Sequence, residues 1–103
     1  MAEPVSDQVN VDDGIAPQAT SKIKWNVKSG KDRTETREIG HLYQLEGQPT
    51  IQGVEISQSP RVYLYAWRST DGTGPPALTV PGPTDQVKNN PVEIGSYRLE
   101  LRQ

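Results

Sequence analysis

Residues 61–68, Arg-Val-Tyr-Leu-Tyr-Ala-Trp-Arg, place the strongest constraint on how this chain folds. They form a dense run of β-branched and aromatic residues between Pro60 and the turn residues 70–72, which is typical of a β-strand. Alternation along a strand gives two apolar sets: Val62, Leu64 and Ala66 on one face, and Tyr63, Tyr65 and Trp67 on the other. Because both faces are apolar, we expect both to be packed, or one to await a partner.

Other segments with strand character end at residues typical of turns. In residues 22–28, Ile23, Trp25 and Val27 alternate with polar residues, which predicts an inward apolar face. Strands are predicted on the same reasoning, with varying regularity, at 22–28, 39–45, 50–57, 61–68, 77–80 and 92–103.

Residues 32–45 also carry helical features. Asp32 and Glu35 have the spacing of a capping box, but Thr34, Thr36 and Gly40 are poor helix formers. We therefore expect a charged loop or weak strand over 31–38, followed by the strand at 39–45.

Two glycine positions interrupt the alternation, and they predict a β-bulge at Gly53 and a second bulge or a kink at Gly95-Ser96. The prolines in 81–91 exclude a central strand and predict a connection there. Together, these patterns predict an all-β fold: a small antiparallel β-sandwich or barrel of about six strands.

The composition indicates a thin core and a need for additional stability. The 103 residues suffice for one domain; hydrophobic residues make up 32%, and cysteine and phenylalanine are absent. Since no disulfide is possible, association with other chains is the remaining source of stability.

Charge divides the chain at about residue 21. Residues 1–21 have four acidic and no basic residues, whereas residues 22–103 have 11 basic and nine acidic ones. We expect an extended acidic N-terminal arm (1–21) on a single β domain (22–103). The arm carries four separated aliphatic residues that we interpret as contacts with a partner chain: Val5, Val9, Val11 and Ile15.

The sequence contains no pattern that indicates catalysis. His41 is the only histidine, cysteine is absent, and neither a nucleophile elbow nor a phosphate-binding loop occurs. The loop around Asp71 supplies one carboxylate, too few for a calcium site. We expect a protein that is not an enzyme and that uses no metal and no cofactor.

The face formed by Tyr63, Tyr65 and Trp67 has three interpretations. A second buried face is favoured, because large aromatic side chains are usually buried. The alternatives are a subunit interface and a platform that stacks on sugar rings or single-stranded nucleic acid. The lysines in 22–28 are interpreted as a solvated row, and nucleic acid is an unlikely partner for a chain with a pI near 5.3.

An acidic arm, a thin cysteine-free β body and long Pro/Gly loops are together similar in style to accessory capsid or decoration proteins of tailed phages, although no family motif is shared. The resemblance implies a structural protein of the virion that binds copies of itself or a capsid lattice. The alternative is a carbohydrate-binding or adhesive β-sandwich. The chain shows no signal peptide and no apolar run long enough to predict a membrane span.

Overall fold

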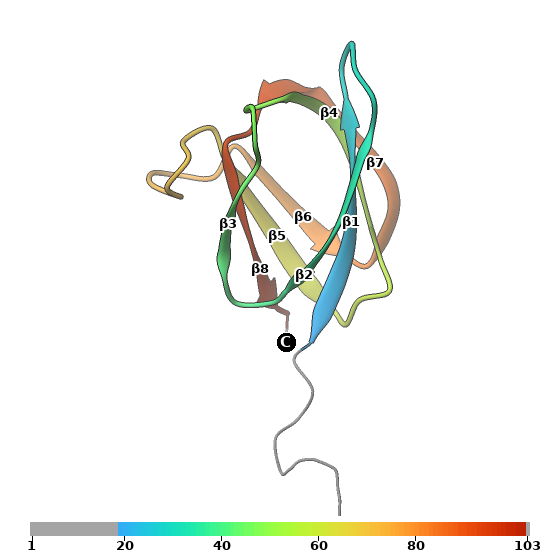
Figure 1. The fold of residues 1–103 in the computed structure, drawn as a ribbon. Coiled ribbons are helices and arrows are strands. Elements are labelled where there is room, and N and C mark those ends of the chain that lie inside the picture. The colour runs from blue at the N-terminus through green and yellow to red at the C-terminus, as the bar shows by residue number, and fades with distance from the viewer. Residues whose placement is uncertain (1–18, 103) are drawn as a thin grey trace, which may run out of the picture.

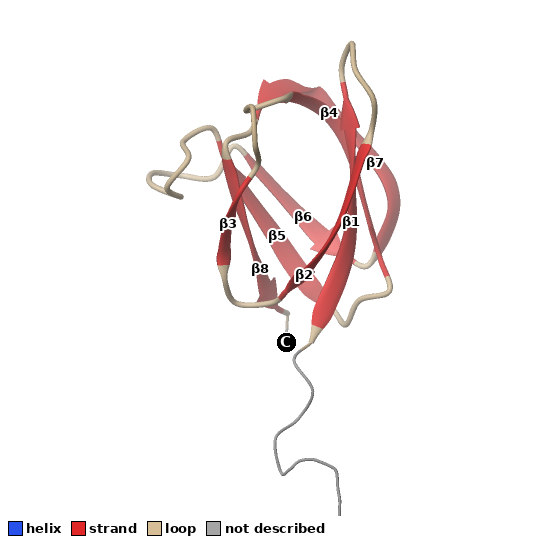
Figure 2. Ribbon diagram, viewed as in Figure 1, coloured by secondary structure: helices blue, strands red, loops and turns tan. Residues whose placement is uncertain are grey.

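A computed structural model of the chain describes residues 19–102, and these form two antiparallel four-stranded sheets (Figures 1 and 2). The eight strands are β1 (Thr20–Val27), β2 (Arg33–Glu38), β3 (Leu42–Gln44), β4 (Thr50–Ser57), β5 (Val62–Trp67), β6 (Leu78–Gly82), β7 (Thr84–Glu93) and β8 (Ser96–Leu101). One sheet has the order β2-β1-β4-β7 and the other β3-β8-β5-β6. The all-β, sandwich-like prediction is confirmed.

The core lies between the two sheets and is made by the inward half of each alternating strand. Trp25 of β1 and Leu64 of β5 are fully buried, as is Tyr97 of β8. The rings of Trp25 and Tyr97 meet edge to face, with centroids 5.1 Å apart. Strands with strict alternation therefore supply the packing that holds the sheets together.

The number of strands is eight rather than the predicted six. The charged stretch 31–38, expected to be a loop or weak strand, contains the regular strand β2. The prediction of a connection over 81–91 is wrong, because β7 occupies most of it. Proline is tolerated there because β7 is an edge strand and need not donate every backbone hydrogen bond.

The two predicted irregularities have different outcomes. The register of β4 shifts between Ile51 and Gly53 against both neighbouring strands, so a bulge lies where it was predicted. Gly95, by contrast, lies between β7 and β8, where the chain passes from one sheet to the other. The second change of phase therefore marks a change of sheet rather than a bulge.

The first strand begins at Thr20, so the last two residues of the predicted arm belong to β1. Val5, Val9, Val11 and Ile15 lie outside the described residues. Within residues 19–102, no helix is long and apolar enough to cross a membrane.

All four edge strands have features that disfavour pairing with another sheet. β3 has only three residues, and β6 contains Pro81. β2 directs the charged residues Glu35 and Arg37 toward the sandwich, and β7 contains Pro91 and irregular pairing with β4. Short strands, proline, bulges and inward charges are known means of protecting sheet edges. The sheet faces are therefore better suited than the sheet edges to bind a partner.

Candidate functional site

The outer face of the β3-β8-β5-β6 sheet carries the aromatic residues singled out in the sequence. Val62, Leu64 and Ala66 point inward, so the alternate residues of β5 point outward. Tyr63 is 36% exposed, and Tyr65 and Trp67 are half-buried. The prediction that this side is a second buried face is therefore wrong. We call this surface the aromatic face: Leu42, Tyr63, Tyr65, Trp67, Thr79, Pro81, Arg98 and Glu100.

The end of the aromatic face at Trp67 is partly covered by the chain itself. The Trp67 indole Nε1–H donates a hydrogen bond of 2.8 Å to the carbonyl of Gly74. Ser96, paired with Trp67 in the register, is fully buried, and its hydroxyl donates to the carbonyl of Ser69. Trp67 therefore fastens the 69–76 loop and is less available to a partner than the two tyrosines.

Tyr63 and Tyr65 form the accessible centre of the aromatic face. Their ring centroids are 6.0 Å apart, with an interplanar angle of 35°. The Arg102 guanidinium carbon lies 5.6 Å from the Tyr63 ring centroid, within the range of a cation–π contact. Arg98, opposite Tyr65, makes an ion pair with Glu100. An aromatic centre is thus surrounded by charged and polar groups.

The outer face of the β2-β1-β4-β7 sheet has a different chemistry. The register places Lys24 between Thr34 and Glu55. The row of lysines thus lies on a central strand among small polar and charged neighbours, which supports the interpretation of a solvated face. We call this surface the polar face: Lys22, Lys24, Thr34, Thr36, Glu55 and Ser57.

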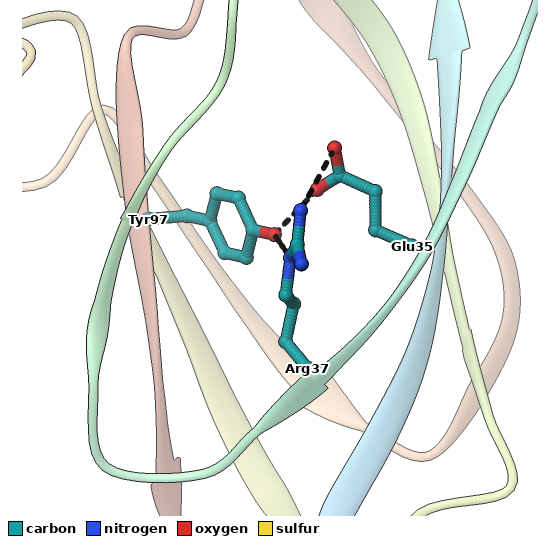
Figure 3. A network of polar contacts seen from close by, with 3 residues as sticks. All are labelled: Glu35, Arg37 and Tyr97. Atoms are coloured by element: carbon teal, nitrogen blue, oxygen red, sulfur yellow. Dashed lines mark hydrogen bonds and ion pairs between the residues drawn. The ribbon is translucent and has the colours of Figure 1, made fainter.

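A network of polar side chains spans the gap between β2 and β8 (Figure 3). The Arg37 Nε–H donates a 3.2 Å hydrogen bond to the Tyr97 hydroxyl, and that hydroxyl donates to the Glu35 carboxylate. The Arg37 and Glu35 side chains are also 3.8 Å apart as an ion pair. The Arg37 guanidinium carbon lies 5.2 Å from the Tyr43 ring centroid. The network links the two sheets on the side where β2 leads into β3.

The electrostatics of this network favour a structural role. Burial, and then the hydrogen bond to Glu35, raise the pKa of the Tyr97 phenol above its ordinary value of 10.0. The hydrogen bond with Tyr97 raises the pKa of Arg37 in turn. A phenol held neutral beside a charged guanidinium does not serve as a base near neutral pH.

Sequence reasoning missed this network, although a signal for it exists. In residues 33–38, Arg33, Glu35 and Arg37 alternate with Thr34, Thr36 and Glu38. This is the period of a strand, with charged side chains turned toward the sandwich in place of apolar ones. The high charge of the stretch concealed the period.

One groove of about 740 Å³ lies where the 68–77 loop approaches the end of β7. Arg68, Asn89 and Asn90 line it together with Pro75 and Pro91. Within residues 19–102, no group of three or more His, Cys, Asp or Glu side chains is placed to hold a metal ion.

Comparisons of the whole chain with protein-family models, with curated proteins and with solved structures give no match.

Proposed function

We propose that this protein is a non-enzymatic structural module that stabilises a larger assembly by binding a protein partner through its aromatic face. The supporting observation is the contrast between the two outer faces: one exposes tyrosines, and the other exposes lysine, threonine and glutamate. Tyrosine and tryptophan are enriched in protein interfaces, where an aromatic centre is typically surrounded by a polar rim.

The partner is another copy of the chain or a lattice of capsid type. The protected sheet edges favour contact through a face over strand addition. A chain of this size gains stability from association because its own core is thin. On this proposal the chain is an accessory protein of a virion, as the resemblance to phage decoration proteins implies.

The molar mass of the full chain, measured by light scattering on a sizing column at increasing concentration, tests this proposal. We expect a closed oligomer for the wild type and a monomer for Tyr63→Ser/Tyr65→Ser. The matched control, Lys22→Ser/Lys24→Ser, changes the polar face and should retain the wild-type mass. If the tyrosine variant keeps its fold and the wild-type mass, the aromatic face is not the interface. If the wild type is a monomer throughout, association with copies is excluded and a foreign lattice becomes the partner to test.

A carbohydrate-binding or adhesive module is the second candidate. The neighbouring rings of Tyr63 and Tyr65, with Thr79 and Arg98 opposite Tyr65, offer stacking and hydrogen-bonding groups to a sugar. A glycan titration followed by tryptophan fluorescence tests it, with Tyr65→Ala as the variant that should lose binding. Trp67→Ala is less informative because that ring also fastens the 69–76 loop. Saturable binding that Tyr65→Ala abolishes would favour this function over assembly.

A further inference from the structure

One wall of the groove beside the 68–77 loop is a supported bulge in β7. From Lys88 to Val92, β7 advances four positions while its partner β4 advances two. The side-chain amide of Asn89 donates hydrogen bonds to the carbonyl of Ile51, at 3.1 Å, and to that of Asn90, at 2.6 Å. These bonds hold the bulge in place. Bulges are frequent next to functional sites, where they redirect side chains.

The opposite wall is the 68–77 loop, which is also fastened to the sandwich. The Trp67 indole donates to the carbonyl of Gly74 at 2.8 Å. The backbone N–H of Gly72 donates to the hydroxyl of the buried Ser96 at 3.0 Å. Because both walls are held by the fold itself, a ligand that enters the groove orders little of the protein, which favours binding.

Arg68 supplies the groove with positive charge. Its carbonyl accepts a 3.3 Å hydrogen bond from the Gln48 side chain and lies against Gly95, where an added Cβ would be 2.6 Å away. Its side chain is exposed, and no carboxylate in residues 19–102 makes an ion pair with it. The hollows that adjoin the groove contain Lys88 and Glu93, one charge of each sign. The groove therefore keeps a net positive charge and a guanidinium suited to a carboxylate.

The rest of the lining suits a peptide better than a sugar or a nucleic acid. Asn90 is exposed, and its side-chain amide can donate to and accept from a peptide group at the same time. Leu78 and Val92 are half-buried and offer contacts to aliphatic side chains. Of the described residues that line the groove, none is aromatic, so sugar rings and bases find no stacking partner. A single arginine is also too little charge for a chain of phosphates.

We propose that this groove of about 740 Å³ binds an extended peptide segment of a partner protein, in which an acidic residue lies among aliphatic ones. Arg68 binds the carboxylate, and Asn90 pairs with a backbone peptide group of the segment. Recognition is by side chains rather than by strand addition, since Pro91 has no N–H to donate at the edge of β7. The site is separate from the aromatic face, so the inference goes beyond the proposed function and does not rest on it.

The first test titrates two synthetic peptides into the full chain and follows backbone amide NMR signals. The probes are acetyl-Gly-Leu-Asp-Val-Gly-amide and the same peptide with Asn in place of Asp. We expect the acidic peptide to shift the amides of Arg68, Thr73 and Asn90, and the neutral one to bind about tenfold or more weakly. Absence of these shifts at millimolar peptide, or equal affinities for the two peptides, overturns the inference.

Two arginines at opposite ends of β5 provide a matched pair of variants. Arg68→Gln should weaken binding of the acidic peptide by about tenfold or more and change that of the neutral peptide by less than about twofold. Arg61→Gln replaces an exposed arginine at the other end of β5 and should leave both affinities within about twofold of the wild type. Asn90→Ala should weaken both peptides alike, by about two- to tenfold. Equal effects of Arg68→Gln and Arg61→Gln would show that the charge is not recognised in the groove.

Further probes separate the peptide from other sources of a carboxylate. Sodium acetate supplies the bare anion, and a peptide that binds no more tightly than acetate overturns the inference. Trigalacturonate supplies carboxylates without aliphatic side chains; if it shifts the same amides at lower concentration than the peptide, an acidic sugar is the ligand and the peptide assignment is wrong. Tyr63→Ser/Tyr65→Ser should retain peptide binding within about twofold. Loss of binding in that variant would place the peptide on the aromatic face, which overturns the groove as its site and leaves the proposed function intact.

Discussion

The two outer faces of the sandwich follow the same backbone alternation but differ in chemistry. On the polar face, Lys24 lies between Thr34 and Glu55, and all three side chains are polar. On the aromatic face, Tyr65 lies between Arg98 and Thr79, beside the exposed Tyr63. Both sheets have apolar inner faces, so formation of the core requires aromatic residues on neither outer face. On our proposal, the outward tyrosines serve a contact made outside the fold.

The largest expected effect is a difference in the free energy of unfolding between substitutions on the inner and outer sides of β5. Leu64→Ala removes a fully buried side chain and should lower the free energy of unfolding by about 2–5 kcal/mol. Tyr65→Ala, one residue later on the outer side, should lower it by about 1 kcal/mol or less. Urea unfolding, measured at a concentration where the protein is monomeric, compares them. Equal losses would mean that the outward tyrosine is part of the core.

The same Tyr→Phe substitution at a buried and at an exposed tyrosine should change the free energy of unfolding by different amounts. Tyr97→Phe removes the hydroxyl that joins Arg37 and Glu35, and should cost about 1–3 kcal/mol because two charged groups lose a buried partner. Tyr63→Phe on the aromatic face should cost less than about 0.5 kcal/mol. Unfolding by guanidinium chloride measures both. A neutral Tyr97→Phe would show that water replaces the hydroxyl at no cost.

The pH dependence of stability should report the same buried phenol. The pKa of Tyr97 is raised in the folded state, so the folded protein holds this proton more tightly than the unfolded chain does. The stabilisation that the protonated Tyr97 phenol contributes is therefore complete below the ordinary pKa of 10.0. It is lost progressively as the pH rises above that value. The loss is at most about 1.4 kcal/mol per pH unit. Urea midpoints from about pH 9 to pH 11 should fall more steeply for wild type than for Tyr97→Phe. Parallel curves would contradict this assignment.

The smallest effect is expected on the polar face. Lys24 and Glu55 are cross-strand neighbours, and an exposed pair of this kind contributes about 0.2–1 kcal/mol at low salt. A double-mutant cycle with Lys24→Ala and Glu55→Ala, repeated at high salt, should give a coupling energy in that range that diminishes with salt. Coupling well above about 1 kcal/mol would indicate that this face is desolvated by a contact of its own.

The sequence allowed prediction of the elements whose apolar residues alternate strictly. Ile23 and Trp25 point to the core as predicted, because the lysines on the other side of the strand make the period visible. The sequence of β2 predicts a loop or weak strand because its inward positions are charged. The prolines of β7 predict a connection because they exclude a central strand, whereas β7 is an edge strand and tolerates them.

The orientation of the aromatic face was beyond sequence reasoning. With apolar residues on both sides of β5, alternation shows which side chains share a face and leaves open which face is buried. Tertiary packing buries the side that carries Val62, Leu64 and Ala66. The hydrogen bond from Trp67 to the carbonyl of Gly74 likewise depends on the path of the 69–76 loop, which turn residues alone do not specify. The roles assigned to Val5, Val9, Val11 and Ile15 remain predictions.

The central claim is that the aromatic face is the contact surface of the protein and the polar face is not. Backbone amide NMR spectra of the full-length protein, recorded over a dilution series, test this most directly. The account predicts that dilution shifts the amides of β5 and β8, including those of Tyr63 and Tyr65, and leaves those of Lys22 and Lys24 in place. Spectra that do not change with concentration would exclude association between copies, and shifts concentrated on β1 and β4 would contradict the claim itself.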